Sequence, residues 1–179
     1  MQRPEDKRTA LVMRAPNADL ARDPRWGRTE ESYGEDAFLT ARLTVANIKG
    51  LQGDNPRYWR TAALMKHFLA NSNEDRRDST SSNFDMRLFY EYYAYPSTKA
   101  LPKAKPCFYG CYNGWNGPAM CVHPCLKEIT RDKWGNNGII WHGWRSTEAA
   151  SQCPPCLSHY GRRSGCGGKG YYRTILGCL

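Results

Sequence analysis

RDPRWGRTEESYGED, at residues 22–36, decides how this chain is interpreted. The stretch mixes Pro, Gly, Ser and Asp with closely spaced charges, and this composition predicts a long loop. The apolar run at residues 11–13 precedes it and predicts a short buried strand. Asp36 closes the stretch at a suitable N-cap position, and apolar residues at helical spacing then continue until Gly50 and Gly53. The chain therefore starts as a strand, a long loop and a helix.

The rest of the sequence continues this alternation of strands and helices. Strands that alternate with helices pair in parallel, so the sequence predicts an α/β fold. In parallel barrels the active site forms at the C-terminal ends of the strands, where Lys66, His67 and Tyr112 fall. We expect strands at residues 61–68, 107–112 and 138–140, a loop at 70–83, and helices at 87–95, stopped by Pro96, and at 124–133.

Length and composition narrow the class of protein. The chain has 179 residues, whereas a (β/α)₈ barrel usually needs about 250, so we expect a fragment of such a fold. No apolar run approaches the roughly 20 residues of a membrane span, so no membrane partner is expected. The charged start, MQRPEDKRTALVM, does not have the pattern of a secretory signal peptide, and the localisation stays open.

The net charge of +9 could indicate a nucleic-acid partner, but its distribution argues against one. Residues 141–179 carry five Lys or Arg and one acid, and residues 97–106 carry three Lys and no acid. These two segments account for seven of the nine excess charges. The remainder is close to neutral, which suits an uncharged ligand better than a polyanion.

Six motifs lie along the chain: APNADLA at 15–21, RDPRWGRTEESYGED at 22–36, KHF at 66–68, DSTSSNFD at 78–85, YN at 112–113 and EITRDKWGNNGII at 128–140. Together they resemble glycoside hydrolase family 3, the β-glucosidases and β-xylosidases. The resemblance implies an α/β fold that is a fragment of a (β/α)₈ TIM-like barrel. It also implies hydrolysis, without a cofactor, of terminal non-reducing β-linked glucose or xylose in oligosaccharides and glycosides; intact relatives are often periplasmic or secreted.

The resemblance also assigns roles to four residues. Arg28, Lys66 and His67 are similar to the family residues that hydrogen-bond the sugar hydroxyls, and Tyr112 is similar to the tyrosine beside the nucleophile. Arg and Lys donate charge-assisted hydrogen bonds, and His supplies a directional donor or acceptor, so these residue types suit a polyhydroxylated ligand.

Structural roles are the alternative for the same residues. Arg28 can pair with Glu31 within the loop, His67 can be a buried histidine with satisfied hydrogen bonds, and Tyr112 can be a core aromatic residue. Trp26 and Glu31 are expected to lock the loop rather than to contact a substrate.

The expected nucleophile is missing from the sequence. The resemblance places an Asp at the position of Gly143, but residues 141–144 read Trp-His-Gly-Trp. In the family the acid/base residue usually comes from a later domain, so neither carboxylate of the retaining mechanism is expected in this chain. We expect no useful hydrolysis by this polypeptide.

A change of reading frame explains two segments that do not resemble the family. Shifted by one base, and with permitted codons, the start of residues 141–179 can read GTDGGAL, and residues 97–106 can read FYKGITEGKA, both of which resemble family segments. The hypothesis divides the chain into a partial barrel at 1–140, with 97–106 out of frame, and an out-of-frame tail at 141–179 without a defined domain.

The cysteines support a different class of function. Beside a non-catalytic carbohydrate-binding remnant, the second alternative is a Cys-rich zinc or redox module, although the spacing is poor for zinc. The residues concerned are Cys107 and Cys111, Cys121 and Cys125, and Cys153 and Cys156, with His123 and His142 nearby.

Overall fold

A four-stranded parallel sheet forms the centre of the computed structural model, which describes residues 11–55 and 57–143. Its strands lie in the order β1-β2-β4-β6, and every neighbouring pair is parallel. The bounds are β1 Val12–Met13, β2 Ala62–Phe68, β4 Cys107–Gly110 and β6 Ile140–His142; β3 Ser81–Ser82 and β5 Gly114–Trp115 form a separate parallel pair. The predicted strands and their parallel pairing are therefore confirmed, and the small β3–β5 pair is an addition.

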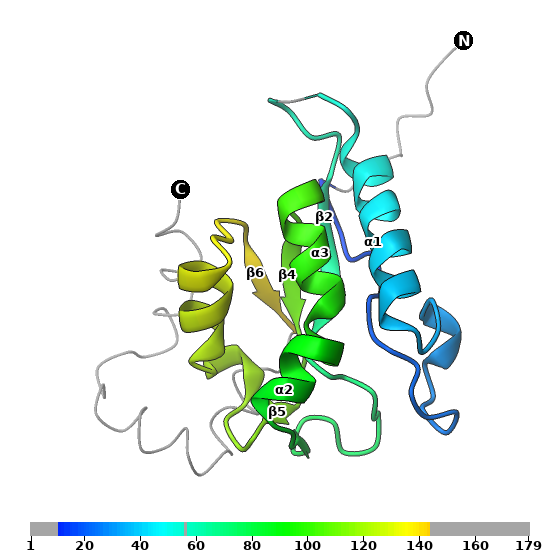
Figure 1. Ribbon diagram of the computed structural model, residues 1–179, viewed down its shortest axis with the longest axis vertical. Helices are drawn as coiled ribbons and strands as arrows, with labels where there is room; N and C mark the ends of the chain where they lie inside the picture. Colours follow the sequence, from blue (N-terminus) through cyan, green and yellow to red (C-terminus); the bar gives the residue numbers. More distant parts are fainter. Residues whose placement is uncertain (1–10, 56, 144–179) are drawn as a thin grey trace.

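The helices follow the strands in the expected alternation. Figure 1 shows α1 and α3 side by side along the sheet, and these two helices contact each other. The helical elements are η1 Thr29–Glu31 and η3 Met120–Val122, both 3₁₀; α1 Ala37–Gln52, α2 Met86–Leu88 and α3 Tyr95–Ala104; and the π-helical turns η2 Phe89–Tyr93 and η4 Leu126–Lys133. In the described part of the chain, no helix is both long and apolar enough to cross a bilayer.

Helix α1 begins and ends where the sequence predicts. The Asp36 carboxylate accepts a hydrogen bond of 2.6 Å from the backbone N–H of Leu39, which caps the first turn. Gly53 has a φ of 76°, and its N–H donates to the carbonyl of Lys49. Glycine adopts this positive φ without steric cost, so the helix ends there.

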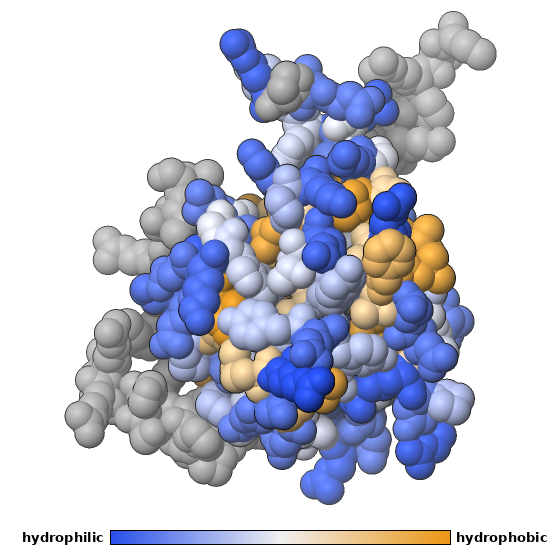
Figure 2. All heavy atoms as spheres, in the orientation of Figure 1, coloured by the Kyte–Doolittle hydropathy of each residue, from blue (hydrophilic) through white to orange (hydrophobic). Residues whose placement is uncertain are grey.

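The buried face of α1 is narrower than its apolar pattern suggests. It consists largely of small and polar residues, whereas Phe38 is 60% exposed and Leu39 and Leu43 are also exposed. Small side chains let α1 lie close to α3, and the larger apolar residues are left on the outside. Figure 2 shows hydrophobic groups among the mainly hydrophilic side chains on this face of the molecule. The buried residues of α1 are Thr40, Ala41, Thr44, Ile48 and Gln52.

The prediction that Pro96 stops the helix at 87–95 is wrong. Helical structure runs through α2 and η2, and Pro96 lies in the first turn of a new helix, α3. Proline is tolerated in a first turn because its missing N–H would have no intrahelical acceptor there. Ala100 and Leu101 of α3 are buried in the core, so residues 97–104 form a packed element.

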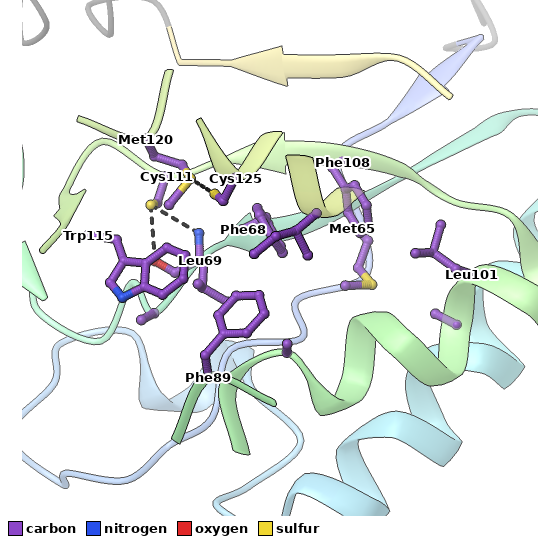
Figure 3. Packing of buried hydrophobic residues seen from close by; sticks show 14 of the residues in the cluster. Met65, Phe68, Leu69, Phe89, Leu101, Phe108, Cys111, Trp115, Met120 and Cys125 are labelled. Carbon is purple, nitrogen blue, oxygen red and sulfur yellow. Dashed lines mark hydrogen bonds between the residues drawn. The ribbon is translucent and has the colours of Figure 1, made fainter. Parts of the chain in front are cut away.

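The main core lies between the sheet and its helices (Figure 3). Phe89 is fully buried and stacks on Trp115 with ring centroids 4.7 Å apart, and Phe68 stacks on Phe108 at 5.1 Å. Cys111 joins this core through its thiol, which lies 3.1 Å from both the N–H and the carbonyl of Leu69. Strands β2 and β4 are thereby fixed to each other just beyond their C-terminal ends.

The other face of the sheet carries a smaller apolar cluster. Leu64, Cys107 and Tyr109 are buried there, with Val12 and Ala62 packed against them. The strand register places three residues side by side across β2, β4 and β6. Lys66 pairs with Tyr109, and Tyr109 pairs with Trp141, which is 47% exposed.

Core packing around Phe89 predicts a large effect of truncation. We expect Phe89→Ala to lower the free energy of unfolding by about 3–5 kcal/mol, because a buried aromatic ring is lost and a cavity remains. Phe38→Ala on the exposed side of α1 is the matched control and should change stability by less than about 1 kcal/mol. Urea unfolding followed by tryptophan fluorescence measures both; equal effects would contradict this core.

Candidate active site

The segment before the long loop is held against the end of β2. Backbone N–H of Ala18 donates to the carbonyl of Lys66 at 2.6 Å, and that of Lys66 donates to the carbonyl of Pro16 at 2.9 Å. The side chain of Asn17 accepts from the N–H of Asp19 at 2.8 Å and forms a local turn. Together these bonds place Asp19 beside the end of β2.

Trp26 anchors the loop itself. The residue is 4% exposed, and its indole N–H donates to Glu74 at 3.2 Å. Thr29 donates from its hydroxyl to the carbonyl of Trp26 at 2.7 Å and begins the turn η1. The loop is therefore tied to the segment that follows β2, and this anchoring carries Arg28 and Glu31 to the end of the strand.

Glu31 is shared by two cations. It accepts hydrogen bonds of 2.7 and 2.8 Å from Nε and Nη2 of Arg28, and one of 2.9 Å from Nζ of Lys66. The hydrogen bonds from Arg28, and after them the one from Lys66, hold the pKa of Glu31 well below its usual range. The carboxylate thus keeps both cations together, although the Arg28 and Lys66 side chains are each only 20% exposed.

His67 lies between a carboxylate and a guanidinium group. Its Nδ1 is 2.7 Å from Oδ2 of Asp19, and its Nε2 is 3.3 Å from Nη1 of Arg28. Burial raises the pKa of Asp19, and the hydrogen bond to His67 opposes that rise. Both ring nitrogens of His67 therefore have partners, as the structural alternative expected.

Glu74 connects the same network to Tyr112. The carboxylate lies 3.7 Å from Nη1 of Arg28 and 2.5 Å from Nη1 of Arg77. The Arg77 guanidinium group in turn lies over the ring of Tyr112, 4.8 Å from its centroid. Arg28, Lys66, His67 and Tyr112, the four residues singled out from the sequence, thus belong to one contiguous group.

Three members of this group were not predicted. Asp19, Glu74 and Arg77 supply its remaining charges, so the network contains three carboxylates and three cations. Asp19 follows the end of the predicted strand at 11–13, and Glu74 follows that at 61–68. Their positions after the C-terminal ends of parallel strands were the available signal.

Position 143, where the resemblance expects a nucleophile, lies against Tyr112. Gly143 is buried, and a Cβ atom at this position would collide with the hydroxyl of Tyr112. The position offers no carboxylate, and any side chain there would require Tyr112 to move. Tyr112 and position 143 are therefore neighbours in this fold.

The described cysteines do not form a metal site. Cys111 and Cys125 are buried in the core, and burial raises the pKa of the Cys125 thiol to about 12. Within residues 11–55 and 57–143, no group of three or more His, Cys, Asp or Glu side chains could hold a metal ion. The zinc or redox hypothesis finds no support in this part of the chain; Cys153 and Cys156 lie outside the described residues.

Comparison with known proteins identifies the family. The sequence model of the Glycosyl hydrolase family 3 N terminal domain matches residues 10–157. The chain belongs to glycosyl hydrolase family 3. The family match includes the long loop, the ends of β2 and β4 and position 143.

Relatives of this family 3 chain include enzymes of two specificities. It is 34% identical over 145 residues to a beta-glucosidase of Rhizobium radiobacter, covering 80% of this chain and 17% of that protein. It is 38% identical over 140 residues to a xylan 1,4-beta-xylosidase of Xylanibacter ruminicola, covering 75% and 16%. The chain thus spans about one sixth of the length of these relatives.

Solved family 3 structures share the fold. A beta-glucosidase of Kluyveromyces marxianus in complex with glucose superimposes with a TM-score of 0.72 at 33% identity, covering 79% of this chain and 17% of that one. A family 3 exo-beta-xylosidase bound to a xylobiose aziridine probe gives 0.76 at 26% identity, covering 79% and 20%. The four parallel strands and their helices are part of a (β/α)₈ barrel, as the sequence predicts.

The burial of His142 leads to a prediction of how the stability of the chain depends on pH. Its Nδ1 is buried and has no hydrogen-bond partner among the described residues, and burial lowers its pKa to about 4. In the unfolded chain the His142 imidazole is protonated near pH 6.5, whereas in the folded chain it is protonated only near pH 4. Stability should therefore fall as the pH drops from about 6.5 to 4, by at most about 3 kcal/mol.

The matched variant for this test is His142→Leu. It should reduce the loss of stability between pH 6.5 and 4, measured by urea unfolding at each pH. A smaller slope will remain because burial also lowers the pKa of His123, and because the lowered pKa of Glu31 makes stability fall near the acid end of this range. An unchanged slope in His142→Leu would show that His142 is not buried in its neutral form.

Proposed function

We propose that this chain forms the sugar-binding part of a family 3 β-glycosidase active site, where it holds a terminal non-reducing β-linked glucose or xylose. The observation that carries this proposal is the contiguous group of Arg28, Lys66 and His67 at the end of β2, organised by Glu31. Relatives named as β-glucosidases and β-xylosidases support the substrate class. Solved relatives that hold glucose or a xylobiose-derived probe support it further.

The chemistry of the network suits an uncharged, polyhydroxylated ligand. Its three carboxylates balance its three cations, so no net charge attracts or repels the sugar. Lys66 has three N–H donors, and the bond to Glu31 uses one of them. Lys66 and Arg28 would donate hydrogen bonds to sugar hydroxyls, while Tyr112 would border the anomeric centre beside position 143.

The retaining mechanism needs a nucleophile that this chain does not supply. A carboxylate must attack the anomeric carbon while a second carboxyl group, about 5–5.5 Å away, protonates the leaving oxygen. Position 143 is glycine, and the acid/base residue would come from a later domain. Loss of a covalent nucleophile costs roughly 10⁴–10⁶ in rate, or about 5–8 kcal/mol of barrier.

We therefore expect the purified chain to bind glucose or xylose without hydrolysing aryl β-glucosides or β-xylosides. Release of the chromogenic aryl group measures turnover. Hydrolysis that persists after rigorous purification would contradict the assignment of position 143. Absence of both turnover and sugar binding would contradict the proposed function itself.

We also propose that residues 97–106 and 141–179 are out of frame relative to an ancestral or intact gene. Resequencing the genomic DNA across codons 95–145 from an independent template tests this directly. Single-base changes that restore GTDGGAL after Ile140 and FYKGITEG after Pro96 would support the proposal. An unchanged frame at both places would exclude a sequencing error. The gene would then encode the present sequence, as a decayed copy of an intact family 3 gene.

Glu31 and its neighbour Glu30 provide a matched pair of variants. Glu31→Gln removes the charge that holds Arg28 and Lys66 together, and we expect affinity for glucose or xylose to fall about fivefold or more. Glu30→Gln changes an exposed residue of the same turn and should leave affinity unchanged. Titration followed by tryptophan fluorescence measures both; equal affinities of the two variants would exclude Glu31 as the organiser of the site.

A further inference from the structure

Asp19 is a buried carboxylate to which the proposed sugar contacts assign no role. Its side chain is 1% exposed, and its Oδ1 has no hydrogen-bond partner among the described residues. Burying a carboxylate with one oxygen unsatisfied costs folding free energy. The hydrogen bond between Oδ2 and His67 is the interaction of the Asp19 side chain that can offset this cost.

The two neighbours of the His67 ring decide where its proton lies. Arg28 can only donate hydrogen bonds, so the Nε2 atom that it approaches at 3.3 Å must be the acceptor. The ring proton then lies on Nδ1, from which it is donated to Oδ2 of Asp19 at 2.7 Å. The opposite arrangement, with a protonated Asp19 donating to Nδ1, would turn an Nε2–H group against the N–H donors of Arg28.

We propose that Asp19 is a positioning residue that fixes His67 in the neutral form protonated on Nδ1, with Nε2 as a hydrogen-bond acceptor. A sugar hydroxyl that replaced the Arg28 contact would then donate to Nε2, so His67 would act as an acceptor while Arg28 and Lys66 act as donors. This last step rests on the proposed function. The assignment of the ring proton rests on the contacts of Asp19 and Arg28.

Hydrogen bonds fix the backbone at Asp19 and so limit where its carboxylate can lie. Its own N–H is held by the side chain of Asn17, and the preceding residue, Ala18, donates to the carbonyl of Lys66 in β2. A carboxylate fixed in this way orients the ring as well as its proton, because rotating His67 would break the 2.7 Å bond.

The test compares Asp19→Leu and Asp19→Asn with the unchanged chain. Two-dimensional ¹⁵N–¹H NMR of the imidazole nitrogens reports directly which ring nitrogen carries the proton, and a His67→Gln variant identifies the His67 signals. We expect protonated Nδ1 in the unchanged chain. In Asp19→Leu the Nδ1–H group loses its acceptor and only the longer Arg28 contact still opposes a proton on Nε2, so the Nε2–H form should gain population. Asp19→Asn should retain Nδ1–H because its amide oxygen can still accept.

Binding of xylose and glucose is measured on the same samples. We expect affinity to fall about fivefold in Asp19→Leu and less in Asp19→Asn, whose neutral acceptor preserves the hydrogen bond. A purely structural role of Asp19 would lower stability in both variants but would not move the ring proton.

The outcomes separate this inference from the proposed function. If the proton moves in Asp19→Leu but the unchanged chain binds neither sugar, the proposed function fails and the assignment of Asp19 stands. If the unchanged chain carries its proton on Nε2, or if Asp19→Leu leaves it on Nδ1, the inference is overturned whether or not sugar binds. Should Asp19→Leu not fold, a proton found on Nε2 in the unchanged chain, or a shift of the proton to Nε2 in Asp19→Asn, would still overturn the inference.

Discussion

The sharing of the Glu31 carboxylate between Arg28 and Lys66 is the interaction on which the site depends. Two cations this close, each largely withdrawn from water, would repel each other without a carboxylate between them. Glu31 can reach both because the buried ring of Trp26 fixes the loop and because the segment at residues 16–18 pairs with β2. The position of the charged side chains thus depends on both the loop and the end of β2.

Much of the fold could be predicted from the sequence because its signals are local. The cap at Asp36 and the positive φ at Gly53 set the bounds of α1, and the strands at residues 61–68 and 107–112 are short apolar runs between polar segments. The failure at Pro96 is equally instructive. The fixed φ of proline suits both a position just after a helix and the first turn of a helix. Sequence pattern alone therefore does not tell whether Pro96 ends one helix or begins the next.

The site was predictable only in part, for a different physical reason. Arg28, Lys66, His67 and Tyr112 lie in motifs that resemble the family, and so does Asp19. The contacts that join Asp19 to His67 and Glu74 to Arg28 nevertheless link residues far apart in the sequence. His67 shows the consequence. Its partner Asp19 is 48 residues away, and no spacing rule links the two. A structural role and the proposed ligand-binding role of Arg28 and His67 are compatible in this geometry, because the contacts that hold these side chains also orient their donors and acceptors.

In the proposed function, the network at the end of β2 recognises a sugar. Backbone NMR chemical-shift mapping during titration with xylose and with glucose tests it most directly. We expect the largest shifts to cluster at Arg28, Lys66, His67 and the neighbouring Tyr112, at the C-terminal end of the sheet. Saturating sugar that left these signals unchanged, or moved only signals on the exposed side of α1, would contradict it.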